Sequence, residues 1–363
     1  MAQLETGIAP KKKKKKKQSL SQSVLQGLLP WKGDSTAEIC RKIVFLAGLI
    51  VMVVAIIIIA NNLLRYGMLE NNAGVDEDGN DTALSAHIID LKNTTPTQQQ
   101  IEALPEGTIN EEYAALYEAN NDFIGWINIP GTNVDYPVMQ GDDNEYYLHK
   151  DFDGNDLFAG TIFTDYEGVF GVNQMPNNTI IYGHNMLYKY QFSALSNYAR
   201  DVEFLKLSPV INFNTLYQNN KYKIISVMRL NTTEEYGEVF PYTQSVYFKN
   251  SSEFYNFILE AMDRSIYETG VDVEYGDELL TLSTCDEAIG LKDLRIVIVA
   301  RKVRENESPE VDTSAIYRKK SIKYYDGYYE IYGNTWHGRT WDISKVKGME
   351  EYIKENGLED EPE

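Results

Sequence analysis

The stretch LTLSTCDEAIGLKDLRIVIVARK, Leu280 to Lys302, contains two strand-like apolar runs joined by nine residues. Cys285 ends the first run and Arg295 opens the second. If the runs are neighbouring antiparallel strands, both side chains lie at the same end of the sheet. A thiol beside a guanidinium, which stays protonated, lies in a field that favours the thiolate, and the guanidinium can also donate to an oxyanion. Arginines at strand ends more often face water. The pair of Cys285 and Arg295 alone therefore does not exclude that Cys285 is an inert core residue.

An uncharged apolar run, Ile43 to Ala60, separates a basic head from an acidic remainder. Its eighteen residues rise about 27 Å as a helix, enough to cross the hydrocarbon core of a bilayer. Residues 1–42 carry a net charge of +7 and residues 61–363 carry −27, so we expect the N-terminus in the cytoplasm and the acidic bulk outside. The basic head, and the absence of a small-residue cleavage site after the run, favour an uncleaved anchor over a signal peptide.

The lysine run Lys11 to Lys17 is also typical of nucleic-acid binding or nuclear targeting. Beside a membrane span its simpler roles are orientation and attraction to anionic membrane lipid, so we expect no nucleic-acid partner. Cys40, on the cytoplasmic edge of the span, cannot then meet Cys285 in one chain. Cys285 is therefore expected to be an unpaired thiol outside the membrane.

The remainder of the chain divides into three parts. Residues 61–107 are polar and poor in large apolar side chains, which indicates an extracellular spacer. Residues 108–304 are mostly short apolar or alternating runs separated by turn residues, which predicts an all-β barrel or sandwich with helical insertions. Residues 305–363 are rich in Tyr and Trp; Asp326-Gly327 predicts a hairpin there, and such aromatic side chains more often pack a small sheet than bind sugars.

Two helices are expected within this pattern. Asn250 and Glu253 fit a capping box at the start of a helix over residues 250–268, and apolar side chains follow at helical spacing. Those side chains are Phe254, Phe257, Ile258, Ala261 and Met262. Asn110 is a candidate N-cap for a shorter helix over residues 111–120.

A histidine would complete the chemistry of the thiol, because an imidazole can exchange protons with it. His184 directly follows the apolar strand-like run NTIIY and Gly183, where a tight turn can hold the ring at a sheet edge. His149 is flanked by aromatic residues, which favours a packed structural role. His184 is therefore the leading candidate.

These short motifs, taken in order, resemble those of the sortases, the cysteine transpeptidases of Gram-positive cell surfaces. TLSTC, Thr281 to Cys285, with Arg295 ten residues later, is similar to their active-site signature, and IIYGHNM is similar to their histidine segment. GWINIPGTNVDYPVMQ, YYLHKDFDGNDLFAGTIFTD and the helix at 250–268 resemble the class B subgroup. The resemblance covers about residues 110–304. The tail departs from the usual pattern, in which the chain ends soon after the arginine strand.

The resemblance implies an all-β, sortase-like eight-stranded β-barrel with helical insertions, preceded by a single transmembrane helix. It implies three catalytic residues: Cys285 as nucleophile, His184 as general acid and base, and Arg295 for the oxyanion and substrate positioning. Ser283 shares a strand face with Cys285 and is a candidate substrate contact, although an ordinary strand serine remains open. No cofactor and no metal are implied.

The implied partners are surface proteins that bear a C-terminal sorting signal and an amine of the cell-wall peptidoglycan. The signal is cleaved after Thr, and in class B relatives it often resembles Asn-Pro-x-Thr. The implied organisation is a basic cytoplasmic head at 1–42, a membrane helix at 43–60, a spacer at 61–107, the catalytic domain at 108–304 and an extension at 305–363.

Three other kinds of protein share some of these features. A papain-like hydrolase has its cysteine before its histidine in the chain, whereas His184 precedes Cys285. A pilin-polymerising sortase of class C usually has a second, C-terminal span and an Asp-Pro-aromatic lid, and neither is evident here; because some class B enzymes build pili, that function stays open. A non-catalytic surface adhesion module fits the span and the aromatic tail, but it gives the thiol no role.

Overall fold

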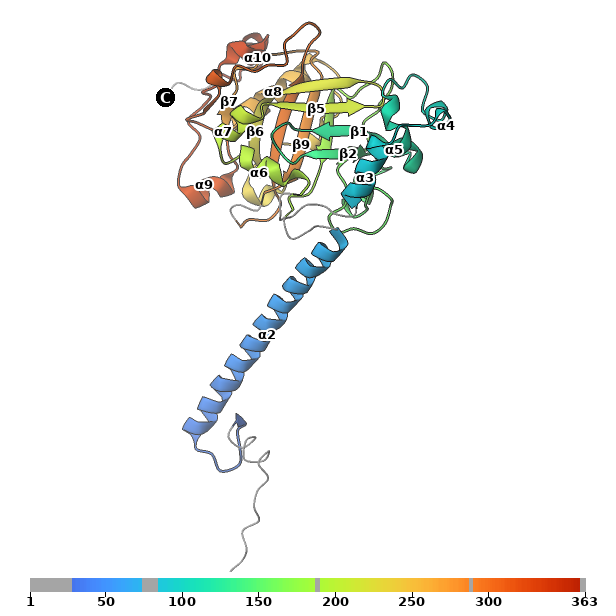
Figure 1. The fold of residues 1–363 in the computed structure, drawn as a ribbon. Helices are drawn as coiled ribbons and strands as arrows, with labels where there is room; N and C mark the ends of the chain where they lie inside the picture. The colour runs from blue at the N-terminus through green and yellow to red at the C-terminus, as the bar shows by residue number, and fades with distance from the viewer. Residues whose placement is uncertain (1–27, 74–83, 187–189, 287–289, 360–363) are drawn as a thin grey trace, which may run out of the picture. The chain divides into compact units, whose positions relative to one another are not determined.

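The computed structural model describes residues 28–73, 84–186, 190–286 and 290–359 (Figure 1). The chain divides into two compact units, Met1–Met68 and Leu69–Glu363, each of which is described by itself.

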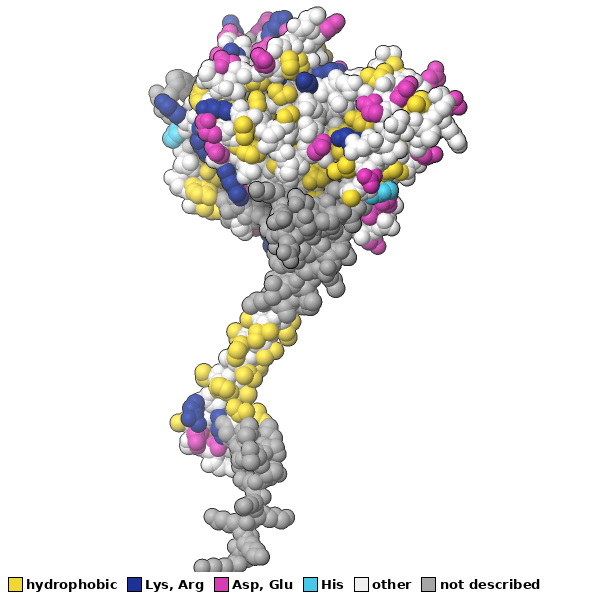
Figure 2. Space-filling view, in the orientation of Figure 1, with side chains coloured by type: hydrophobic (Ala, Val, Ile, Leu, Met, Phe, Trp, Pro, Cys, Tyr) yellow, Lys and Arg dark blue, Asp and Glu magenta, His cyan; other side chains and the backbone are white. Residues whose placement is uncertain are grey.

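The first unit is dominated by the long helix α2 (Thr36–Ala73). The hydroxyl of Ser35 accepts the Glu38 N–H at 3.3 Å, which caps the start of the helix. The stretch Thr36–Ile57 is long and apolar enough to cross a membrane. Its mean hydropathy is 2.5, and only 6% of its most apolar part is buried against the rest of the protein. Apolar side chains surround this part of the helix (Figure 2). The sequence prediction of one apolar N-terminal helix is confirmed.

Eight strands of the second unit form a closed barrel in the order β1-β2-β3-β4-β9-β10-β6-β5. Neighbouring strands are antiparallel except for two parallel pairs, β2 with β3 and β4 with β9. The strands are β1 (Phe123–Asn128), β2 (Asp135–Met139), β3 (Phe163–Thr164), β4 (Asn178–Tyr182), β5 (Val210–Thr215), β6 (Asn219–Asn231), β9 (Leu279–Cys285) and β10 (Leu294–Lys302). The predicted all-β, eight-stranded barrel with helical insertions is confirmed.

Alternation along β10 divides its side chains between two cores. Ile296 and Ile298 point into the barrel, whereas Val297 and Val299 point outward into a second apolar cluster. Helix α8 (Ser251–Arg264) covers that outer cluster, so neither face of β10 is exposed to water over these residues. Burial on both faces explains why this strand reads as an almost continuous apolar run.

Helix α8 begins where the sequence predicts. The Asn250 side chain accepts the Glu253 N–H at 3.0 Å, and the Glu253 carboxylate accepts the Lys249 N–H at 2.9 Å. The five apolar residues expected on one face are all buried. The helix therefore packs on the outside of the barrel and covers the outer face of β6 and β10.

The segment expected to be a polar spacer contains two helices, α3 (Leu84–Asn93) and α4 (Gln98–Glu102). Ile88 of α3 is buried in an apolar cluster with Tyr113 and Leu116. These two residues belong to the short helices η1 (Glu111–Tyr113) and α5 (Ala114–Ala119), which stand where one helix was expected. Asn110 caps neither helix with its side chain, since its amide donates to Thr215 O at 2.6 Å. Part of the expected spacer thus packs on the barrel.

The hairpin predicted at Asp326-Gly327 is wrong, because these residues open a helix, α9 (Asp326–Tyr332). Within the helix, Tyr328 and Tyr332 are four residues apart and their ring centroids lie 4.5 Å apart. Tyr324, which precedes the helix, stacks on Tyr328 with the ring centroids 3.8 Å apart. Gly327 is needed for close packing rather than for a turn, since an added Cβ would lie 3.2 Å from the Tyr236 ring.

The rest of the tail runs along one side of the unit from α9 to α10 (Figure 1). Its strand β11 (Tyr317–Arg318) pairs with β7 (Tyr267–Glu268), and β12 (Val346–Lys347) pairs with β8 (Val273–Glu274). Helix α10 (Met349–Asn356) then packs against α8. The extension is therefore an integral layer of the unit.

Candidate active site

Cys285 and Arg295 lie directly opposite each other on β9 and β10. Directly opposed residues of antiparallel strands project from the same face of the sheet. Leu280 and Leu282 of β9 point into the barrel, so Ser283 and Cys285 lie on its outer face. The thiol is partly exposed and forms no disulfide. The structure thus brings together the thiol and guanidinium that the sequence singled out.

His184 lies beside Cys285 on the other side of β9. Strand β4 runs parallel to β9 with Tyr182 opposite Ser283, and two residues further along come His184 and Cys285. Two hydrogen bonds agree with this proximity: the Gly183 backbone N–H donates to Ser283 O at 3.2 Å, and the Asn185 side-chain Nδ2 donates to Cys285 O at 2.9 Å. Three neighbouring strands therefore place the three predicted residues at one rim of the barrel.

The imidazole of His184 is held in a largely desolvated position. Its Nε2 lies 3.1 Å from Leu148 O, and its ring stacks on Phe158 with the centroids 6.4 Å apart. Burial lowers the pKa of His184 below its usual value, the hydrogen bond to Leu148 O opposes this, and the positive charges of His149 and Arg295 lower it further. The ring thus favours its neutral form until a negative partner is present.

His149 does not have the packed role expected from its aromatic neighbours. Its side chain is exposed, and its charge acts on His184. The preceding 3₁₀ turn, η2 (Tyr146–Leu148), exposes the histidine and buries Tyr147 instead. His149 therefore belongs to the electrostatic surroundings of the site.

Ser283 is 3% exposed, and its hydroxyl pairs with the hydroxyl of Tyr242 at 2.8 Å. Burial raises the pKa of Tyr242, whereas the bond to Ser283 and the charge of Arg295 lower it. Tyr242 thus lies within electrostatic reach of Arg295 and of Cys285. No periodic pattern in the sequence marks this tyrosine, since it lies in a 3₁₀ turn after Pro241.

A buried ion pair follows the thiol directly. Asp286 pairs with Arg229 of β6, and both side chains are almost fully buried. The Asp286 N–H also donates to Leu294 O at 2.9 Å. The residue after Cys285 is thus fixed from two sides, which holds the end of β9 in place.

The three groups suit acyl transfer through a covalent intermediate. A thiolate can attack a carbonyl carbon, a guanidinium can donate to the oxyanion that forms, and an imidazolium can protonate the leaving amine. Among the described residues no three His, Cys, Asp or Glu side chains gather as ligands for a metal ion.

Comparisons with known proteins identify the family of this chain. Residues 127–303 match the family model described as Sortase domain. The chain is 31% identical over 217 residues to Sortase B of Listeria monocytogenes, covering 60% of this chain and 84% of that protein. It is 29% identical over 196 residues to Sortase B of Staphylococcus aureus, covering 54% of this chain and 76% of that protein.

Solved structures give the same result. A Bacillus anthracis protein described as similar to sortase B is 29% identical, with a TM-score of 0.50, and the match covers 61% of this chain and 94% of that chain. Sortase B from B. anthracis in complex with AAEK2 is 28% identical, with a TM-score of 0.51 and the same coverage.

Proposed function

Because this chain belongs to the sortase family, as a class B cysteine transpeptidase, we propose that it joins surface proteins to the cell wall through a thioester on Cys285. The substrate is a C-terminal sorting signal, which is cleaved after its Thr. The acceptor is an amine of the peptidoglycan. The observation that carries this proposal is the convergence of Cys285, His184 and Arg295 at the ends of adjacent strands.

In the first half-reaction the Cys285 thiolate attacks the Thr carbonyl carbon, and a C–S bond forms. The Arg295 guanidinium donates to the resulting oxyanion. The tetrahedral intermediate collapses, the C–N bond breaks, and the His184 imidazolium gives its proton to the departing amine. The products are a thioester on Cys285, a neutral His184 and a released peptide.

In the second half-reaction an acceptor amine attacks the thioester carbonyl carbon. Neutral His184 takes the proton that the amine loses, and the C–S bond breaks to restore the Cys285 thiolate. A new amide bond links the sorted protein to the acceptor. Protons and charges balance over the cycle, so no other reactant is needed.

We also propose that residues 43–60 anchor the enzyme in the membrane, with the N-terminus in the cytoplasm and the catalytic domain outside. The net charge of +7 over residues 1–42 supports this orientation and a contact with anionic lipid.

The full chain in detergent micelles, incubated with a library of Asn-Pro-x-Thr-type peptides, tests the reaction. Intact-mass spectrometry should show an acyl adduct that digestion maps to Cys285, and an added amine should discharge it as a ligated product. Cys285→Ala should abolish adduct and product. Turnover that survives this substitution, or an adduct on another residue, would refute the assignment.

A further inference from the structure

Gln191 has a strained backbone seven residues after His184. Its φ of 48° and ψ of −124° lie in a region that residues with a side chain rarely adopt. Such a conformation is energetically unfavourable and persists where surrounding contacts over-determine it. The side chain is 2% exposed, so an amide is also buried here. An unfavourable backbone conformation and a buried amide are both destabilising unless other contacts offset them.

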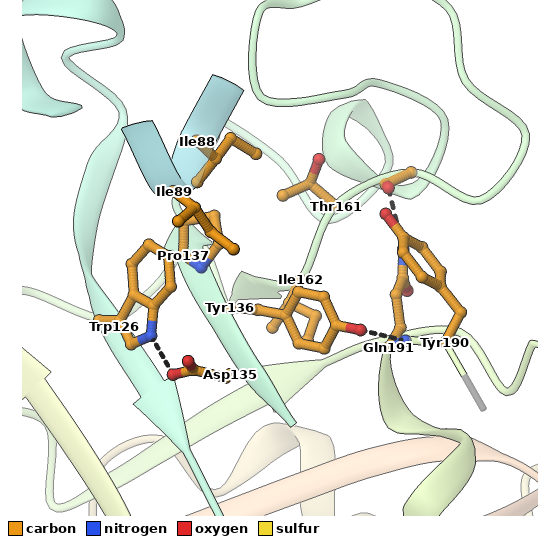
Figure 3. Close-up of a pocket in the computed structure, with 11 residues that line it drawn as sticks. Ile88, Ile89, Trp126, Asp135, Tyr136, Pro137, Thr161, Ile162, Tyr190 and Gln191 are labelled. Carbon is orange, nitrogen blue, oxygen red and sulfur yellow. Dashed lines mark hydrogen bonds between the residues drawn. The ribbon is translucent and has the colours of Figure 1, made fainter. Parts of the chain in front are cut away.

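Both polar atoms of the Gln191 side-chain amide form hydrogen bonds. Its Oε1 accepts the His184 N–H at 2.8 Å. Its Nε2 donates to Ala159 O at 2.6 Å and to Gly160 O at 2.9 Å. Its backbone N–H donates to the Tyr136 hydroxyl at 3.2 Å, the bond that Figure 3 shows. The residue therefore ties three separate segments of the chain together.

The same segment holds the other side of the His184 backbone. Phe192 N donates to His184 O at 3.1 Å, so Gln191 and Phe192 together fix both polar groups of the His184 main chain.

The contact with Gly160 reaches the imidazole by a second route. Gly160 has a φ of +56°, and an added Cβ would lie 2.5 Å from Leu148 O, the atom that His184 Nε2 faces. Gly160 thus packs directly on the peptide that bonds the ring. The contacts thus link both parts of His184: its backbone bonds Gln191, Gln191 bonds Gly160, Gly160 packs on Leu148, and Leu148 O faces the His184 ring.

We propose that Gln191 is a positioning residue for His184. The Gln191 side-chain amide holds the His184 backbone and, through Gly160, the Leu148 carbonyl that faces the imidazole. The proposal rests on the function assigned above, in which His184 carries the proton between half-reactions. Because Gln191 contacts neither Cys285 nor Arg295 in any described hydrogen bond, it acts through the imidazole alone.

Gln191→Met in the full chain tests this, since methionine keeps the length of the side chain and removes its polar atoms. We expect kcat for the sorting-signal peptide to fall 10–100-fold, because a misplacement of about 1 Å can cost 10²-fold, while KM stays within threefold. Gln191→Glu keeps an oxygen that can accept the His184 N–H, but its second oxygen faces the carbonyls of Ala159 and Gly160. We therefore expect a loss of kcat between those of wild type and Gln191→Met.

A matched control is Gln140→Met. The Gln140 amide also donates to two backbone carbonyls, Asp165 O at 2.9 Å and Gly168 O at 2.7 Å, but it makes no described hydrogen bond to His184. Its loss should lower the melting temperature about as much as Gln191→Met does, with kcat within twofold of wild type. Equal losses of kcat in both variants would reduce Gln191 to a structural role and overturn the proposal.

A second measurement does not depend on turnover. NMR titration of ¹³C-labelled histidine, with the His184 signal assigned from His184→Gln, reports the imidazole directly. The charged neighbours His149 and Arg295 are unchanged in Gln191→Met, so release of the ring into water should raise its pKa. An unchanged titration in folded Gln191→Met and Gln191→Glu would overturn the proposal. Absent acylation in wild type with a shifted titration would instead refute the proposed function alone.

Discussion

At the scale of single residues, His184 is the most informative group because its burial has a measurable cost. Desolvation lowers the pKa of its imidazole below the ordinary 6.5, so the unfolded chain binds this proton at higher pH than the folded chain does. The contribution of neutral His184 to the free energy of unfolding is fully present at pH values above 6.5, the pKa in the unfolded chain. It is lost as the pH falls from 6.5 toward the lower pKa of the folded protein.

This sign predicts a difference between wild type and His184→Gln. The free energy of unfolding of wild type, relative to the variant, should increase as pH rises through the window below 6.5. Urea denaturation of the unit Leu69–Glu363 between pH 5 and 8 measures it, and titrating groups that do not interact with His184 cancel between the two proteins. A pH-independent difference would show that the ring is hydrated in the folded protein.

Sequence reasoning found residues that end or begin strands and missed those that turns provide. Cys285, Arg295 and His184 each adjoin an apolar run, and pairing of these runs was enough to bring them together. Gln191 and Tyr242 lie in loops without periodicity. Their positions depend on contacts with residues tens of positions away, which no local pattern encodes.

At the scale of elements, the tail shows how tertiary contacts override a local turn signal. Asp-Gly between tyrosines favours a hairpin in isolation. Here Gly327 lets α9 approach Tyr236 and Leu291, and the rings of Tyr328 and Tyr332 pack along the helix. The helix thereby packs against the turn η5 (Glu234–Tyr236) and the connection between β9 and β10. Strand runs, by contrast, were predictable because burial on one or both faces imposes a pattern.

One buried carboxylate clamps the tail onto α8. Asp263, 3% exposed, accepts from Arg339 Nε at 2.9 Å and from Trp341 Nε1 at 2.7 Å. Asp263→Ala removes the carboxylate that accepts from both groups, so it should lower the free energy of unfolding by about 3–5 kcal/mol. Urea denaturation of the unit Leu69–Glu363 measures the loss.

The control for this clamp is Lys347→Ala, which breaks the pair between Lys347 and Glu274 at 3.0 Å. The lysine side chain is 81% exposed, so the loss should stay within about 1 kcal/mol. If both substitutions cost the same, the tail does not contribute to the stability of the unit.

At the scale of the whole molecule, the two cysteines report membrane orientation. Cys40 lies in α2 and is exposed, and Cys285 lies in the barrel unit. In the proposed orientation, a membrane-impermeant maleimide added to intact protoplasts should label the variant that keeps only Cys285. The variant that keeps only Cys40 should react only after permeabilisation. The reverse result would place the barrel in the cytoplasm.

The parallel pairing of β4 with β9 also has a consequence in time. A ribosome completes the strand before His184 about 100 residues ahead of Cys285, as the span of the Asn185–Cys285 contact shows. Pairings between distant segments form slowly, because the intervening chain must first be ordered. The three side chains Cys285, His184 and Arg295 come together only when β4, β9 and β10 have paired, so the site is complete only once this part of the barrel has closed.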